Sequence, residues 1–230
     1  MIKISTENNY LAFVILVGGK SRRFGEDKGL FEFRRKPLID YQIETLTKFP
    51  YNIFIIAHTS QQVQEYIERV NYEDITGFIL DELGDTVVSD VRSPMIGLYS
   101  AFLELEKLSY QKIFAISCDM PLIQPPVVDL LINESYNHDA VIPIWNNWYV
   151  EPLFAIYPIS KGLKVSREYI LKKKFKLTNL IKKEWDVNYI SIENKIKAID
   201  KKLLTFLNIN RVEDLNILKY KYRIEKKKNK

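Results

Sequence analysis

The feature that most constrains this chain is an apolar run that ends abruptly in glycines and cations. Residues 13–17 are all apolar, and Gly18 and Gly19 follow them directly. Such a run predicts a strand over roughly residues 11–17 that is buried in a parallel sheet. Because glycine has no Cβ, the backbone N–H groups after the strand can approach a ligand closely. Three cations within residues 20–23, and then Lys28, make an anion the expected ligand, and a nucleotide phosphate is the leading candidate.

Two common phosphate-binding motifs do not fit this loop. A P-loop requires a glycine five positions before Gly19, and Val14 stands there. The G-x-G-x-x-G fingerprint of dinucleotide-binding proteins fails because Gly18, Gly19 and Gly25 have a different spacing. The loop therefore belongs to another nucleotide-binding class, or it is a simple turn with solvated cations.

Composition narrows the class of protein further. A chain of 230 residues with 47% hydrophobic residues is long enough for one α/β domain with a sizeable core. It contains no run of eighteen apolar residues and no basic, apolar and cleavable leader, so we expect neither a membrane partner nor secretion. A single cysteine, Cys118, excludes an internal disulfide and predicts a cytoplasmic location.

The net charge of +5 is concentrated in the last residues. Residues 219–230 contain seven Lys or Arg and one Glu, a net charge of +6, so residues 1–218 carry −1. We expect residues 1–218 to form the folded domain and residues 219–230 a flexible, solvated tail. An RNA-binding arm is the alternative for the tail, but no basic face over the rest of the chain favours a nucleic-acid partner.

Strand and helix patterns alternate along the chain. Residues 53–57, 78–80 and 112–117 read as further buried strands, and helical spacing separates them. Alternation of this kind implies parallel crossovers, so the expected fold is α/β, a Rossmann-like three-layer sandwich with a mostly parallel twisted sheet. Further strands are expected at residues 140–144, 149–157 and 206–210, and helices at 38–49, 63–70, 95–105, from 125, within 161–183 and at 211–220.

Two aspartates directly follow predicted strands. Asp119 comes just after residues 112–117, where ligands bind in open α/β sheets, and its carboxylate could hold Mg²⁺ together with phosphate oxygens and water. Asp81 follows residues 78–80 and would lie on the same edge of a parallel sheet. The alternative for both is a turn or capping aspartate. The neighbouring Cys118 is interpreted as a buried thiol and not as a nucleophile.

These motifs together resemble a known family. Residues 16–28, LVGGKSRRFGEDK, fit the pattern L-x-G-G-x-S-x-R-hydrophobic-G-x-D-K. This pattern is the signature loop of nucleotidyltransferases with a glycosyltransferase-A-like fold, and the form here is most similar to the molybdenum cofactor guanylyltransferase (MobA) family. The resemblance spans residues 11–218 and includes Lys36-Pro37, SPMIG at 93–97, CDMP at 118–121, EPLFAIY at 151–157 and FLNINRVEDL at 206–215.

The resemblance implies a reaction and the residues that perform it. The implied reaction transfers GMP from GTP to the terminal phosphate of molybdopterin and releases pyrophosphate, with Mg²⁺ as the cofactor. Molybdoenzymes and other cofactor-synthesis proteins are candidate partners. The implied catalytic residues are Asp119, which also binds the metal, Lys28 and Arg23. The implied nucleotide contacts are Leu16, Val17, Gly18, Gly19, Lys28, Asp81, Pro94, Gly97 and Asp119, and the implied substrate-side residues are Asn208 and Asn210.

Two departures from the family pattern leave alternatives open. Ile56 stands where relatives have an asparagine that contacts the nucleotide, and His58 is a nearby polar substitute. Ser93 replaces a glycine, which brings into question any positive φ at that position. The same fold could therefore use CTP with molybdopterin, or a nucleoside triphosphate with a sugar 1-phosphate. A non-catalytic protein that binds nucleotide and delivers cofactor is an alternative of another class.

Overall fold

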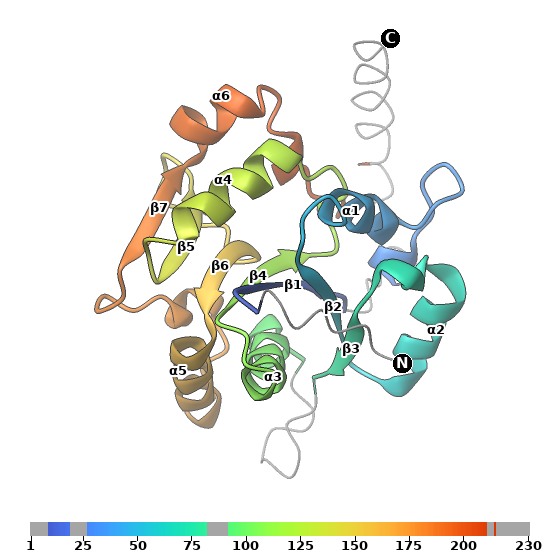
Figure 1. Cartoon of the computed structure of the whole chain (residues 1–230), viewed down its shortest axis with the longest axis horizontal. Coiled ribbons are helices and arrows are strands. Elements are labelled where there is room, and N and C mark those ends of the chain that lie inside the picture. Colours follow the sequence, from blue (N-terminus) through green and yellow to red (C-terminus); the bar gives the residue numbers. More distant parts are fainter. Residues whose placement is uncertain (1–8, 19–26, 82–91, 211–213, 215–230) are drawn as a thin grey trace.

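The computed structural model describes residues 9–18, 27–81, 92–210 and 214. Within these residues, seven strands form one sheet in the order β3-β2-β1-β4-β6-β5-β7 (Figure 1). The first four are mutually parallel, β6 is antiparallel to β4 and β5, and β7 is parallel to β5, so the predicted mostly parallel sheet is confirmed. The strands are β1 Leu11–Leu16, β2 Asn52–Ala57, β3 Gly77–Leu80, β4 Lys112–Ser117, β5 Ala140–Ile144, β6 Phe154–Pro158 and β7 Val187–Ser191.

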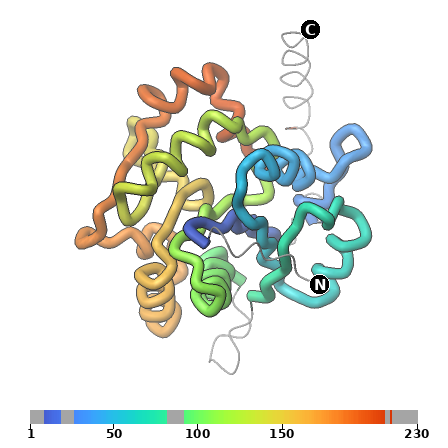
Figure 2. The backbone as a smooth tube through the Cα atoms, in the orientation of Figure 1, coloured from blue at the N-terminus to red at the C-terminus, as the bar shows by residue number. Residues whose placement is uncertain are grey.

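The chain begins at the centre of the sheet and fills the two sides in turn. From β1 it passes to β2 and β3 and then crosses back to β4. It continues to β5, returns as β6 between β4 and β5, and then forms β7 beyond β5 (Figure 2). Helices α1 (Leu38–Leu46), α2 (Ser60–Arg69) and α4 (Pro125–Ser135) pack on one face, and α3 (Pro94–Lys107) and α5 (Ile159–Leu171) on the other. The predicted three-layer α/β architecture is therefore confirmed.

Shorter helical segments complete the described chain. Most are single turns at the ends of strands or loops. They are η1 Lys28–Leu30, η2 Tyr72–Asp74, η3 Leu177–Leu180, the π-helical turn η4 Ile192–Ile196, α6 Lys197–Ile199 and η5 Leu204–Phe206. Among the described residues, no helix combines the length and the apolar character needed to cross a bilayer.

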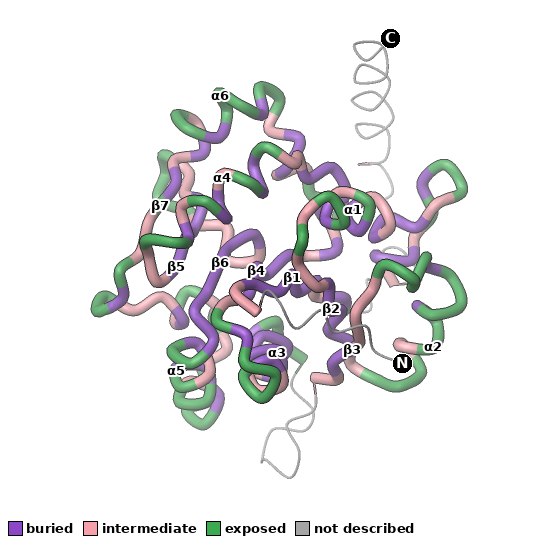
Figure 3. Tube along the Cα trace, viewed as in Figure 1, coloured by how far each residue is buried: buried purple, intermediate pink, exposed green. Residues whose placement is uncertain are grey.

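The core lies on both faces of the sheet. Successive side chains of a strand point to opposite faces, so Phe13 and Ile15 pack with the helices of one layer while Ala12 and Val14 pack with those of the other. All residues from Leu11 to Ile15 are consequently buried, and the central strands appear as a continuous buried band in Figure 3. This double coverage explains why β1 reads as an uninterrupted apolar run in the sequence.

Two predicted strands were wrong in part or in whole. β6 begins at Phe154, because the preceding residues form a turn in which the Phe154 N–H donates to the Glu151 carbonyl at 3.1 Å. Pro152 has no N–H to give a ladder at this point. The strand expected at residues 206–210 is absent. The Ile209 N–H donates a hydrogen bond to the Asp119 carbonyl at 2.8 Å, but no ladder of hydrogen bonds to a neighbouring strand forms here.

Other boundaries differ for local reasons. Helix α2 begins three residues before the predicted start, because the Thr59 side chain accepts from the Gln62 N–H and caps it. β7 falls within residues 186–202, for which the sequence predicted no element, because this edge strand is only partly buried and its apolar signal is weak. The helix predicted at residues 211–220 lies outside the described residues apart from Asp214.

Contact between α3 and α5 depends on Gly162. A Cβ at this position would lie 2.5 Å from Cζ of the Phe102 ring, which is fully buried. Helix propensity alone favours alanine over glycine by about 1 kcal/mol, whereas overpacking costs about 1–3 kcal/mol. A 2.5 Å contact with a fully buried ring puts the overpacking cost at the upper end of this range, so we predict that Gly162→Ala lowers the free energy of unfolding by about 2 kcal/mol in urea titrations.

Ser160→Ala is the matched control for this substitution. Ser160 lies on the exposed side of the same helix, so its replacement should change stability by less than about 0.5 kcal/mol. Equal stabilities of Gly162→Ala and the wild-type protein would contradict the α3–α5 packing described here.

Candidate nucleotide-binding and transfer site

The carboxyl ends of the first four strands form one edge of the sheet. Gly18, His58, Asp81 and Asp119 come within two residues of the ends of β1, β2, β3 and β4 respectively. Leu16 pairs with Ser117 in the β1–β4 register, and the Cys118 N–H donates to the Leu16 carbonyl at 3.2 Å. The glycine loop and Asp119 therefore begin on the same side of the molecule.

A cleft of about 150 Å³ opens at this edge. Six residues predicted to contact a nucleotide line it, namely Leu16, Val17, Gly18, Asp81, Pro94 and Gly97. The other lining residues are Ile56, His58, Arg92, Ser93, Ser117 and Leu153. The fold thus brings together residues from six separate parts of the sequence, and their contacts with a nucleotide stay a prediction.

His58 fills the space between Gly18 and Asp81. Gly18 has φ +154°, and a Cβ there would lie 2.3 Å from His58 Nε2, so both backbone conformation and space require glycine. His58 Nδ1 lies within hydrogen-bonding distance of Asp81 Oδ2. The His58 N–H donates to Gln62 Oε1 at 2.7 Å. The sequence identified His58 only as a nearby polar group, and its contact with Asp81 depends on the pairing of β2 with β3.

The structure explains the two departures from the family pattern. Ser93 has φ −149°, so no positive φ is needed, and its hydroxyl accepts from the Met95 N–H and caps α3. Ile56 is buried, and its Cγ2 would lie 3.3 Å from a Cβ at Gly97. Ile56 therefore contributes packing, and the polar side chain that follows β2 at this edge of the cleft is His58.

Lys28 joins three distant parts of the chain. Its Nζ lies 3.5 Å from Asp119 Oδ2 and donates to Asn210 Oδ1 at 2.8 Å. The side chains of Lys28 and Asp119 are 21% and 20% exposed, so their charges are only partly screened by water. The Ile209 N–H donates to the Asp119 carbonyl, which holds the Asn210 segment in place. Of the predicted residues, Asn208 is exposed nearby, and Gly19 and Arg23 lie outside the described residues.

Asp27 fixes the position of Lys28. Its carboxylate accepts from the Gly29 N–H at 2.9 Å, from the Tyr66 hydroxyl at 2.6 Å and from the Gln62 side-chain amide. Burial raises the pKa of Tyr66 well above its usual value, so the phenol keeps its proton and remains a donor. These buried contacts hold the start of η1, and with it Lys28, against α2.

Gln42 supports the loop that carries Asp119, and sequence reasoning missed it. Its fully buried amide donates to the carbonyls of Ser117 at 2.7 Å and Met120 at 2.9 Å. Its position could have indicated this role, because Gln42 is a polar residue on the apolar side of α1, four residues from both Leu38 and Leu46.

The thiol of Cys118, next to Asp119, is buried and its pKa is raised by that burial, as expected for an inert cysteine.

Glu151 is a second carboxyl group near Asp119. Burial raises the pKa of Glu151, a hydrogen bond from Trp145 lowers it, and the negative charge of Asp119 raises it. The Trp145 indole N–H donates to Glu151 Oε1 at 2.6 Å. The sequence offered Glu151 only as part of a family pattern, because nothing in it indicates proximity to Asp119.

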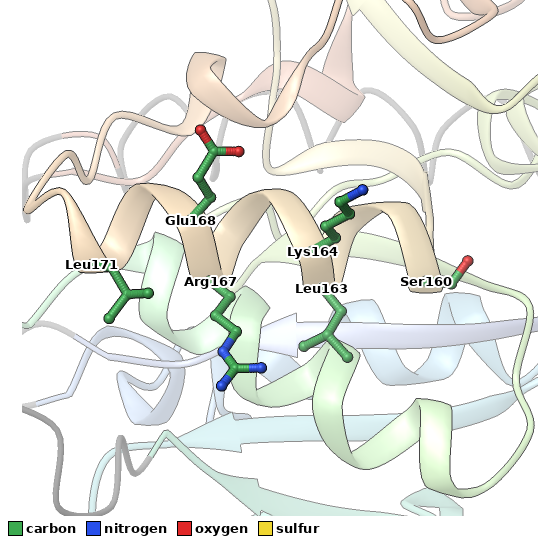
Figure 4. Close-up of a pocket in the computed structure, with 6 residues that line it drawn as sticks. All are labelled: Ser160, Leu163, Lys164, Arg167, Glu168 and Leu171. Carbon is green, nitrogen blue, oxygen red and sulfur yellow. The ribbon is translucent and has the colours of Figure 1, made fainter.

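A second hollow lies along α5 and contains none of the predicted site residues. Leu163, Arg167 and Leu171 project from one side of this helix, and Lys164 and Glu168 from the other (Figure 4). The helix carries part of the basic face expected within residues 161–183. Just after the end of α5, the basic segment approaches the cleft, and the Ser93 hydroxyl lies 3.4 Å from the Phe175 carbonyl.

The fold and the edge site define a nucleotidyltransferase. A glycine-edged cleft and a lysine–aspartate pair lie at the carboxyl edge of a mostly parallel sheet, which is where ligands bind in open α/β folds. The family model described as MobA-like NTP transferase domain matches residues 13–183. The chain belongs to this family, and the predicted family membership is confirmed.

Relatives and solved structures agree with this assignment. The probable molybdenum cofactor guanylyltransferase of Pyrococcus horikoshii is 37% identical over 210 residues, covering 90% of this chain and 98% of the relative. The protein of the same name from Methanosarcina mazei is 28% identical over 91% of this chain and 90% of its own length. The crystal structure of molybdopterin-guanine dinucleotide biosynthesis protein A from Archaeoglobus fulgidus has a TM-score of 0.68 and 28% identity, covering 89% of this chain and 95% of that one.

The contact between Tyr66 and Asp27 provides a test of how Lys28 is positioned. Tyr66→Phe removes one hydrogen bond to a carboxylate, and such bonds contribute about 1.5–3 kcal/mol. We predict a loss of about 1–2 kcal/mol in the free energy of unfolding, measured by chemical denaturation, and a lower rate of nucleotide turnover. Tyr72→Phe, on the exposed turn η2, is the control and should change neither quantity. Wild-type stability of Tyr66→Phe would show that the Asp27 contact is unimportant.

Proposed function

We propose that this protein transfers GMP from GTP to the terminal phosphate of molybdopterin and releases pyrophosphate. The observation that carries the proposal is the contact of Lys28 with Asp119 beside a cleft edged by Gly18 and Asp81. Family membership and the printed names of the relatives support the choice of substrates. The protein is proposed to act in the cytoplasm, and molybdoenzymes or other cofactor-synthesis proteins are its proposed partners.

The cleft is proposed to bind the base of the nucleotide. A carboxylate has about four lone-pair sites, so Asp81 can keep its contact with His58 and still accept from the N1–H and N2–H groups of guanine. Gly97 also lines the cleft, and its missing Cβ lets α3 pack closely against the apolar side chains of Leu16 and Ile56, which line the cleft beside it. This arrangement favours a base with adjacent donors, which cytosine lacks.

The phosphates are proposed to extend from Gly18 toward Lys28. Backbone N–H groups of Gly18 and Gly19 and the cations Lys28 and Arg23 would bind them. A pair of unit charges 4 Å apart contributes about 4 kcal/mol at an effective dielectric constant near 20. Contacts of this size, strengthened as pyrophosphate leaves, could supply a substantial part of the rate enhancement.

The residues around Asp119 fit a magnesium ion. Among the described residues, no group of three or more potential protein ligands exists, but Mg²⁺ usually takes only one or two protein carboxylates plus phosphate oxygens and water. The partly exposed carboxylate of Asp119, with Lys28 on one side, provides such a ligand. When bound, Mg²⁺ would neutralise charge on the phosphate that is attacked.

The chain's own residues are proposed to act by positioning and by charge. A phosphate acceptor is already anionic near neutral pH, so no general base has to remove a proton from it. Lys28 would stabilise the departing pyrophosphate, while Asn210 orients Lys28 and lies with Asn208 on the acceptor side.

The family model ends at residue 183, yet Lys28 contacts Asn210, so we propose that the catalytic domain extends to residue 218, with residues 219–230 as a tail.

Nucleotide choice separates this proposal from the use of CTP or of a sugar 1-phosphate. With molybdopterin and Mg²⁺ supplied, pyrophosphate release from GTP should exceed release from ATP, CTP and UTP by at least about tenfold, the effect of 1.4 kcal/mol of selective binding. Replacing molybdopterin by glucose 1-phosphate should abolish release. A preference for CTP, or equal release with the sugar phosphate, would overturn the guanylyl proposal.

Substitution of Asp119 separates an enzyme from a non-catalytic binding protein. Asp119→Asn keeps the shape but removes the charge, and we predict that turnover falls by at least about 100-fold, as expected for loss of a charged group that stabilises the transition state. GTP binding, measured by calorimetry without acceptor, should persist. Asp129→Asn, on the exposed side of α4, is the control and should have wild-type turnover. GTP binding without turnover in the wild-type protein would favour the accessory role.

A further inference from the structure

The connection between β5 and β6 carries two unusually exposed aromatic side chains. Trp148 is 84% exposed and Tyr149 is 72% exposed. Strands β4 and β5 are both antiparallel to β6, so the β5–β6 connection leaves the sheet at the same edge as Asp119. The two rings are therefore presented on the side of the molecule where transfer is proposed to occur.

The base of this connection is part of the site wall. The Ser117 N–H donates to the Leu153 carbonyl at 2.9 Å, and both residues line the nucleotide cleft. On the other side, the Trp145 ring packs edge-on against Phe206, with 5.6 Å between ring centroids, two residues before Asn208. The connection thus lies between the nucleotide cleft and the segment that carries the substrate-side asparagines.

The backbone at Trp148 adopts a conformation that favours glycine. Its φ is +68°, within a tight turn in which the Trp148 N–H donates to the Trp145 carbonyl at 2.9 Å and the Trp145 N–H to the Tyr149 carbonyl at 2.8 Å. A large side chain at such a position costs conformational energy. Because the ring is almost fully exposed, its packing against the described residues does not offset that energy. Contact with a bound partner that has a flat apolar surface would offset it.

We propose that Trp148 and Tyr149 form a stacking surface for the pterin ring of the acceptor. This inference rests on the proposed function, because it takes the acceptor to be a phosphate-bearing pterin. Four residues lie between Trp148 and Leu153, which makes five Cα–Cα steps, so the turn extends at most about 17 Å from the cleft. An acceptor whose phosphate is beside Asp119 would place its ring system at the far end, within reach of this turn. Aromatic side chains bind flat heterocycles by stacking irrespective of their hydrogen-bonding edges.

The decisive variant is Trp148→Gly. Glycine suits the positive φ, so the melting temperature should not fall and any loss of function belongs to the ring. The KM for molybdopterin should rise about tenfold or more, equivalent to about 1.4 kcal/mol, while the KM for GTP changes less than about twofold. Tyr149→Ala should act in the same direction, and Trp148→Phe should retain most of the affinity.

Tyr72→Ala is the matched control, because Tyr72 is 54% exposed but precedes β3 at the opposite edge of the sheet. It should leave both KM values unchanged. A wild-type KM for molybdopterin in Trp148→Gly, or an equal rise in Tyr72→Ala, would overturn the stacking inference and leave the proposed transfer reaction intact.

A second measurement uses a pterin without phosphate. Titration of the full-length protein with 6-hydroxymethylpterin, followed by the anisotropy of pterin fluorescence, should show binding to the wild type and at least tenfold weaker binding to Trp148→Gly. Equal binding to the two proteins would overturn the inference. Absence of GMP transfer by the wild-type protein would instead refute the proposed function, so the two failures are distinguishable.

Discussion

The parallel pairing of β1 with β4 is the constraint on which the site depends. Leu16 and Ser117 are register partners, so the two strands end together and their following residues share one edge. That pairing places Gly18 and Asp119 within reach of one ligand, although 100 residues separate them in sequence. A shift of the register by one residue would turn each side chain of β4 into the opposite layer and place the ring of Phe114 where the smaller Ile113 and Ala115 pack. The different side chains of the two layers therefore fix the pairing.

The second half of the chain completes the site by reversing direction. β6 is antiparallel to β4, so its preceding turn, and not its end, meets the carboxyl edge. Glu151, Trp145 and the turn beyond them reach the vicinity of Asp119 in this way. The Asn210 segment closes the opposite side through its bond to Lys28. In the proposed function, the first half of the chain would supply the nucleotide side of the site and the second half the acceptor side.

Sequence reasoning succeeded where the physical signal is local. The apolar runs of β1, β2 and β4 gave their positions within a residue, because a strand buried on both faces has no polar positions to obscure it. The glycines and cations of the first loop indicated the family. The strand predictions were wrong at residues 149–153 and 206–210. Apolar and aromatic residues suggested strands there, but they form a turn and a loop.

The sequence by itself determined the class of fold and the family, and it predicted an anion-binding loop followed later by Asp119. These depend on the periodicity of side chains and on the absence of a Cβ, which are properties of short segments. Only the tertiary structure decided that His58 contacts Asp81, that Lys28 joins Asp119 to Asn210 and that Gln42 supports the Asp119 loop. Such contacts join residues far apart in the chain, and they form only when strand register and helix packing bring those residues to one place.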